Sequence, residues 1–282
     1  MKKSIYIIAL LAIVFCGCDK GDKREPLTER GMQICNTWKE VTHSIIQDVT
    51  AQIFYLNDWI QADESERPVL EKYYFSDGYD YFSDGYVLDK GDGVYEIYRG
   101  AGSLYMLVNT YGTELSQSGA VWEIHKKLGY SFQAYSYAIP AFVSEPENVF
   151  YMTYLGGNSW EFVMDSATSA GSSLDLTIRV PGISTPVELF SHCFSVEGNG
   201  SYCYSEMDEN SVPDIVSLQF DVQEDLVNGF SQDDYLASTH YWDAGKVSLA
   251  AKKQGRDDID VLVEYIGGGS TNISYRGVTE QW

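Results

Sequence analysis

The chain has 282 residues and carries 41 acidic against 19 basic side chains, a formal net charge of −22. Nucleic acid and anionic membrane surfaces repel such an acidic protein, so we expect no nucleic-acid partner. With 44% hydrophobic and 14% aromatic residues the sequence is too apolar for a disordered acidic chain, and we expect a folded body with an acidic surface.

The first residues have the pattern of an export signal. Lys2 and Lys3 precede an apolar run, residues 5–15, that is too short to span a bilayer. Small Gly17 stands before Cys18, as a lipoprotein signal peptidase requires. We therefore expect residues 1–17 to be removed and Cys18 to become the lipid-bearing first residue. The alternative is an ordinary secretory signal with a cysteine nearby.

In this N-terminal signal and in its general composition the chain resembles exported lipoproteins of Gram-negative gut bacteria of the Bacteroidota type. The resemblance implies an outer membrane lipoprotein of the cell envelope, attached to the membrane by its lipid anchor. In that group, acidic residues after the lipidated cysteine can direct a protein to the cell surface. Here residues 19–22 are only partly acidic, so surface exposure is an expectation that this segment supports in part.

A charged segment and one helical pattern follow the signal. Residues 18–30 are charged and contain Pro26, which is typical of a flexible tether. Over residues 31–61, apolar side chains recur at steps of three and four, which predicts one long amphipathic helix. Polar Lys39, His43, Gln47 and Thr50 share its other face, so we expect the helix to pack by a single apolar stripe.

The rest of the chain predicts strands. Apolar and polar residues alternate over 174–180, 216–222 and 259–265, and turn signals such as Asp92-Gly93 separate the candidate strands. Half-buried strands at short spacing favour antiparallel sheets. The expected fold is therefore mainly β, a sandwich, meander or barrel, in a body of residues 31–282 that the sequence leaves open to division into two subdomains.

One cysteine pair can be tested by register. Cys193 and Cys203 flank Gly198-Asn199-Gly200, a hairpin turn signal. A three-residue loop would place both cysteines on one face, whereas a two-residue turn would place them on opposite faces. A disulfide between Cys193 and Cys203 is thus a candidate that depends on this turn.

Tyrosine is abundant, with 22 residues, and a tandem repeat holds several of them: residues 74–79 read YFSDGY, and so do residues 81–86. A tyrosine ring has a flat apolar face and a polar tip, which suit stacking on sugars and protein interfaces. Cross-strand packing is the alternative role, because tyrosine also favours strands. The candidate ligand surface consists of Tyr79, Tyr81 and Tyr86.

The sequence contains no glycine-rich phosphate loop, no HExxH, no serine nucleophile elbow and no CxxC. We therefore predict no catalytic residue, no metal site and no other cofactor, and favour a protein without catalysis. The expected role is recognition of a glycan or of another envelope protein. Two alternatives stay open: a structural or fimbria-like surface subunit, and a carbohydrate-active hydrolase that uses paired carboxylates.

Overall fold

The computed structural model describes ten segments of the chain, and all structural statements below concern them. These segments are residues 29–75, 85–99, 103–127, 147–165, 172–180, 194–207, 213–228, 242–253, 256–267 and 270–281. Cys18 and the predicted tether up to residue 28 lie outside them.

Helical segments follow one another at the start of this region. They are α2 (Glu29–Val41), the π-helical η1 (Thr42–Gln47), α3 (Asp48–Gln61) and, after a short turn, α4 (Arg67–Tyr74). The single helix predicted over 31–61 is not confirmed in that form, because a π-helical stretch separates two α-helices. Helix α4 was not predicted, since Pro68 stands in its first turn, where proline is tolerated, and was interpreted as a break.

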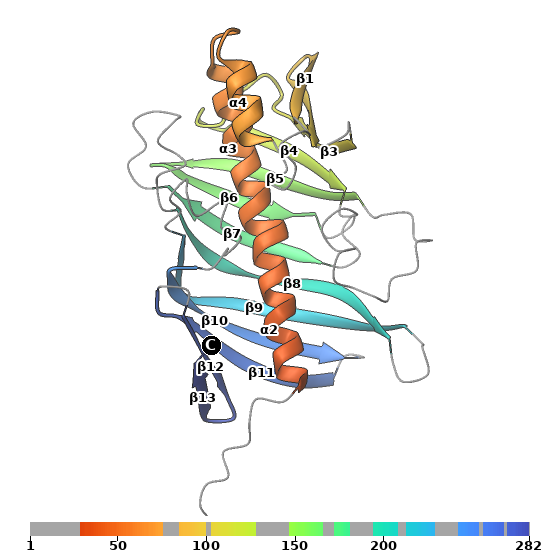
Figure 1. Cartoon of the computed structure of the whole chain (residues 1–282), viewed down its shortest axis with the longest axis vertical. Helices are drawn as coiled ribbons and strands as arrows, with labels where there is room; N and C mark the ends of the chain where they lie inside the picture. The colour runs from red at the N-terminus through yellow and green to blue at the C-terminus, as the bar shows by residue number, and fades with distance from the viewer. Residues whose placement is uncertain are drawn as a thin grey trace, which may run out of the picture.

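Every described strand belongs to one open antiparallel sheet. The strands are β1 (Tyr86–Gly91), β2 (Val94–Arg99), β3 (Ser103–Asn109), β4 (Val121–Lys127), β5 (Glu147–Gly156), β6 (Ser159–Met164), β7 (Ser173–Arg179), β8 (Phe194–Met207), β9 (Pro213–Asn228), β10 (Ala244–Lys253), β11 (Arg256–Tyr265), β12 (Thr271–Tyr275) and β13 (Val278–Gln281). Their order in the sheet is their order in the chain, a meander (Figure 1). The prediction of a mainly β, antiparallel fold is confirmed.

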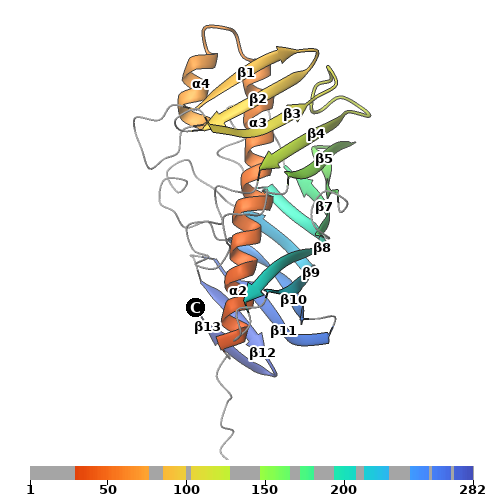
Figure 2. The same cartoon turned by 90° about the vertical axis from the view of Figure 1, so that its right-hand side faces the viewer.

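The helices and the sheet form two layers. Figure 2 shows α2 and α3 running along one face of the sheet, across the strands. Three aromatic side chains on these helices mark the crossing: the Trp38 ring lies 4.9 Å from Phe220 on β9, Phe54 packs edge-on against Trp160 of β6, and Trp59 packs against Tyr95 of β2. The face that the helices cover is called the inner face, and the opposite one the outer face.

The apolar character of the inner face follows from the alternation of buried and more exposed residues along the strands. The three alternating stretches predicted from the sequence fall on β7, β9 and β11, and their apolar members are buried, except Val222, which is partly buried against the core. At about 25 cal/mol per Å² of apolar surface removed from water, this inner face is the largest stabilising contribution in the fold. The inner face is therefore the core of the molecule.

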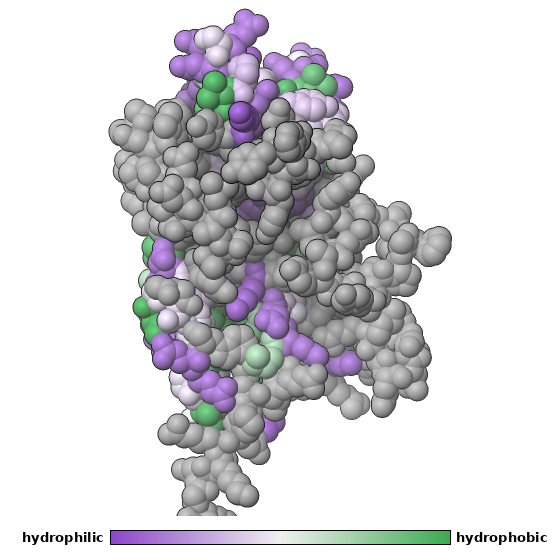
Figure 3. All heavy atoms as spheres, in the orientation of Figure 1, coloured by the Kyte–Doolittle hydropathy of each residue, from purple (hydrophilic) through white to green (hydrophobic). Residues whose placement is uncertain are grey.

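Hydrophilic side chains gather at the end formed by α4 and β1 on the helix side of the molecule (Figure 3). Glu71 of α4 ties this end together, because its Oε1 accepts hydrogen bonds from Trp59 Nε1 and from the backbone N–H of Val87, each at 3.1 Å. The Arg67 guanidinium lies over the Trp59 ring at 4.4 Å. Helix α4 thus closes the β1 edge of the sheet.

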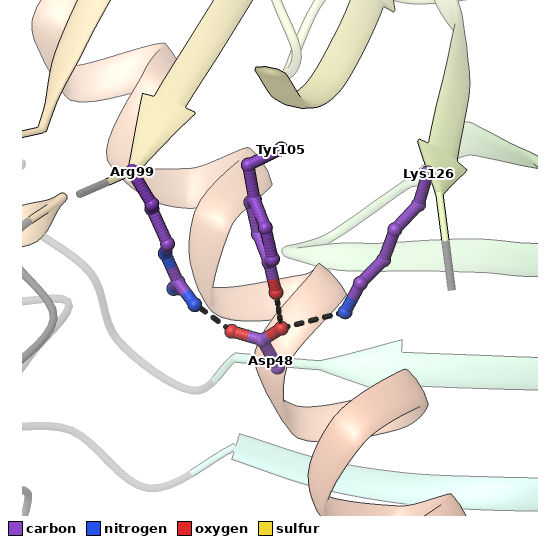
Figure 4. A network of polar contacts seen from close by, with 4 residues as sticks. All are labelled: Asp48, Arg99, Tyr105 and Lys126. Carbon is purple, nitrogen blue, oxygen red and sulfur yellow. Dashed lines mark hydrogen bonds and ion pairs between the residues drawn. The ribbon is translucent and has the colours of Figure 1, made fainter. Parts of the chain in front are cut away.

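A carboxylate at the start of α3 fastens the helices to the sheet (Figure 4). Asp48 accepts from Lys126 Nζ of β4 at 2.6 Å, from Arg99 of β2 at 3.0 Å and from the Tyr105 hydroxyl of β3. A bulge in β3 aims Tyr105 inward: Ile97 and Tyr98 pair with Met106 and Leu104, so Tyr105 is the extra residue. Lys126 is only 1% exposed, which makes its ion pair with Asp48 a buried one.

Substituting Asp48 tests how much this contact holds the helix on the sheet. Asp48→Ala removes the carboxylate beside a buried ammonium group, and we expect the free energy of unfolding to fall by about 3 kcal/mol. The control is Glu197→Ala, which breaks the half-exposed pair between Glu197 and Arg179 and should cost less than about 1 kcal/mol. Urea unfolding measures both. Equal losses in the two variants would contradict a buried, structural role for Asp48.

The helix packs by more than the single stripe that the sequence predicted. Gln47, Thr50, Gln52 and Asp58 are all buried, although the first two were assigned to its polar face. Both carboxyl oxygens of Asp58 lack a hydrogen-bond partner among the described residues. Burial raises the pKa of Asp58 from 3.8 to about 8, so this side chain is protonated at neutral pH.

Asp58 makes stability depend on pH. Between about pH 4 and pH 8 the unfolded chain releases this proton and the folded chain keeps it, so the free energy of unfolding falls by up to about 1.4 kcal/mol per pH unit. Asp58→Asn keeps the shape and cannot ionise. We expect the asparagine variant to gain stability over the wild type as the pH rises through this range, measured as urea midpoints at a series of pH values. A difference in urea midpoint between the two proteins that stays constant with pH would refute the raised pKa of Asp58.

Candidate functional site

The outer face carries a row of side chains that crosses most of the sheet. Directly paired residues on antiparallel strands share a face, so the register alone defines the row. Its members, here called the outer row, are Asn109, Glu123, Tyr151, Val163, Asp175, Asn199, Asp221, Ser248, Leu262, Ser274 and Thr279, one from each strand from β3 to β13. Most of these side chains can donate or accept hydrogen bonds.

A second row runs beside it over the middle strands. Ser173, Ser201, Gln219, Ala250 and Asp260 pair in turn from β7 to β11. Several of these side chains are small, and a hollow of about 830 Å³ lies where the two rows meet. We call this hollow the groove; its polar lining is Ser173, Asn199, Ser201, Gln219, Asp221, Ser248, Asp260, Ser274 and Arg276.

Hydrogen bonds hold part of this lining in place. The hydroxyls of Ser201 and Ser217 lie 2.8 Å apart, and those of Ser274 and Thr279 lie 2.7 Å apart. Asp221 accepts from the side-chain amide of Gln223. The groove therefore offers pre-positioned hydroxyl, amide and carboxylate groups on a rigid sheet, which is the donor set that binds a polyhydroxylated molecule.

Two glycines let the strands under the groove approach each other. A Cβ on Gly198, whose φ is +122°, would stand 2.2 Å from the carbonyl oxygen of Asp175 on β7. One on Gly200 would meet the Phe220 ring at 2.6 Å. Gly198-Asn199-Gly200 is therefore part of β8, at a register shift against β9, and the predicted hairpin turn at these residues is wrong.

This correction removes the basis of the predicted disulfide. Cys203 lies in β8 beyond the two glycines, and its backbone N–H donates to the hydroxyl of Ser172 at 2.9 Å. Cys193 lies outside the described residues, so the pair itself stays a prediction. No turn at Gly198-Asn199-Gly200 brings the two cysteines together.

Tyr86 is the one residue of the predicted ligand surface that the structure describes. Tyr86 begins β1 on the outer face, 40% exposed, with its ring stacked on that of Tyr98 at 4.6 Å. Tyr98 in turn donates to Glu96 at 2.8 Å, and that bond raises the pKa of the Tyr98 hydroxyl. This is the cross-strand packing that the sequence left as the alternative role. Tyr79 and Tyr81 lie outside the described residues.

Another group of aromatic and titratable residues is built around Glu123 and Tyr151 of the outer row. Tyr111, 58% exposed, donates its hydroxyl to Glu123, and His125 Nε2 lies 2.6 Å from the other carboxyl oxygen. These bonds lower the pKa of Glu123 and keep it ionised. Tyr151 is the direct neighbour of Glu123 on β5. We call Tyr111, Glu123 and Tyr151 the tyrosine cluster.

Sequence reasoning missed both the groove and the tyrosine cluster. The groove joins residues from Ser173 to Arg276, and only the strand register shows that they are neighbours. Tyr111 had a local signal, because it stands before Gly112 in a polar turn, where a large aromatic residue is unusual.

The described residues contain neither a cluster of metal-ligating side chains nor a membrane-spanning helix. No group of three or more His, Cys, Asp or Glu side chains in the described segments is placed to hold a metal ion. Within the same segments, no helix is long and apolar enough to cross a membrane. No protein-family model, no curated protein and no solved structure matches this chain.

Proposed function

We propose that this chain is a lipid-anchored recognition protein of the outer bacterial envelope that binds an uncharged glycan in the groove on its outer face. The observation that carries the proposal is the groove: a hollow of about 830 Å³ whose polar lining is presented by neighbouring strands. Sugars are recognised by such sets of hydroxyl, amide and carboxylate groups, because each sugar hydroxyl both donates and accepts hydrogen bonds.

Charge selects the class of glycan. Asp221 and Asp260 line the groove together with one cation, Arg276, and the outer row adds Asp175 and Glu123. An acidic surface on a protein of net charge −22 repels uronic acids and sulfated sugars. An uncharged polysaccharide meets no such repulsion.

The two alternative functions have less support. The groove carboxylates Asp221 and Asp260 lie two strands apart with Ser248 and Ala250 between them, so they are not the facing pair that a hydrolase requires. A fibre subunit would need an open strand edge. At β1, one of the two edge strands of the described sheet, the N–H groups of Val87 and Gly91 already donate, to Glu71 and to Asp89 respectively, which leaves fewer N–H groups on this edge for strand addition.

Affinity electrophoresis tests the proposed ligand. The full chain, purified in detergent, is run through gels that contain soluble glucan, mannan or xylan, with polygalacturonate as the anionic comparison. We expect at least one uncharged polysaccharide to retard the protein, and polygalacturonate to have no effect. The double variant Asp221→Ala, Asp260→Ala should weaken this binding by about tenfold or more.

The matched control changes a charged pair on the same face but outside the groove. Arg179→Ala, Glu197→Ala removes an exposed ion pair of β7 and β8 and should leave the retardation unchanged. Absence of retardation by all three uncharged polysaccharides would refute the proposed ligand class. A groove variant that binds as tightly as the wild type would refute the location.

The lipid anchor has its own test. Cys18→Ser removes the thiol at the position where the predicted signal places the lipid acceptor, so we expect loss of palmitate labelling and loss of the protein from the membrane fraction. Cys16→Ser is the matched control, because it changes the neighbouring cysteine and leaves the acceptor in place. Palmitate label that persists in the Cys18→Ser variant would refute lipidation at Cys18.

A further inference from the structure

The groove and the tyrosine cluster are two parts of one row. From Tyr151 on β5 the outer row continues through Val163 and Asp175 to Asn199 and Asp221 in the groove. Neighbouring strands lie about 4.8 Å apart, so Tyr151 and Asp221, four strands apart, are separated by about 19 Å. A ligand that contacts both must be several sugar units long.

Tyr111 is held in place as a preformed platform. Its backbone φ of +52° lies in the left-handed region, which a bulky residue rarely adopts. Two contacts fix it there: the backbone N–H donates to the Asn109 side chain at 3.0 Å, and the phenol donates to Glu123. Strained backbone positions cluster at binding and catalytic sites, so a fixed, exposed ring at such a position is a candidate contact for a ligand.

Beside Tyr111 stands Tyr151, half-buried, with its pKa raised by burial and by the charges of Glu123 and Asp165. The two tyrosines present neutral rings whose apolar faces suit the C–H face of a sugar. The side chains between these rings and the groove include Val163, which is apolar, and Asp175, which is exposed. The row thus offers aromatic rings at Tyr111 and Tyr151 and mainly hydrogen-bonding groups in the groove.

We propose that Tyr111 and Tyr151 form a stacking subsite for the same glycan, and that the ligand is an extended uncharged polysaccharide chain lying across the strands from the tyrosine cluster into the groove. This inference rests on the proposed function and adds the length and direction of the ligand. Successive strands offer a side chain at nearly regular spacing along the row, which suits a polymer of repeating units. A single sugar or a short chain end would use the groove alone.

Chain length is the variable that tests the inference. The probes are size-fractionated oligosaccharides, from disaccharide to octasaccharide, prepared from glucan, mannan and xylan. Binding to the full chain in detergent is measured by calorimetry. We expect affinity to rise with length well beyond the tetrasaccharide, and Tyr111→Asn and Tyr151→Thr each to lower the affinity for the octasaccharide by about tenfold. Affinity for the shortest oligosaccharide that binds should stay unchanged.

The substitutions are chosen to separate binding from folding. Asparagine tolerates the left-handed backbone, so Tyr111→Asn should keep or raise the unfolding temperature while it weakens long-chain binding. Threonine suits the strand position of Tyr151. Tyr86→Thr is the control, because Tyr86 is a tyrosine of the same face that stands off the outer row.

The outcomes distinguish this inference from the proposed function. Binding that does not depend on chain length, or tyrosine variants that weaken short and long chains alike, would overturn the extended track and leave groove binding intact. If no oligosaccharide or polysaccharide of the three series binds, both the proposed glycan binding and the extended binding track are refuted. An equal loss of long-chain binding in Tyr86→Thr would also overturn the assignment of the subsite.

Discussion

Packing of the helices against the inner face of the sheet is the contact on which the rest of the molecule depends. A single antiparallel sheet has no second sheet to cover its apolar face, so α2 and α3 must do so across many strands. Trp38, Trp59 and the ion pair of Asp48 with Lys126 fix the helices at intervals along this path. A buried charge pair adds specificity of position more than net stability.

Covering one face leaves the other available for binding. Because inner and outer residues alternate along the strands outside the bulges, each strand that contributes a buried side chain such as Leu176 also presents an exposed one such as Asp175. The outer row is therefore a by-product of the same register that builds the core. Its chemistry is free to vary without any change in packing, which makes such a face suitable for a recognition surface.

The sequence predicts those features that depend on local pattern. Alternation identified strands such as β7 and β11, and the turn chemistry of Asp92-Gly93 identified the first hairpin, since both are properties of neighbouring residues. Gly198 was misassigned because the same residue serves tight turns and close strand contacts, and only the position of Asp175 decides between them. The groove could not be predicted, because its lining spans more than a hundred residues and is assembled by register.

The meander also determines the order in which the chain can complete its fold. Each strand pairs only with its neighbours in sequence, so hairpins can form locally and early. The helix has the opposite requirement: the indole of Trp38 donates to the hydroxyl of Tyr265 on β11, 227 positions later in the chain. Among the described elements, α2 is thus the first to be synthesised and one of the last to complete its contacts, so its apolar surface stays exposed to non-native contacts until the final strands are made.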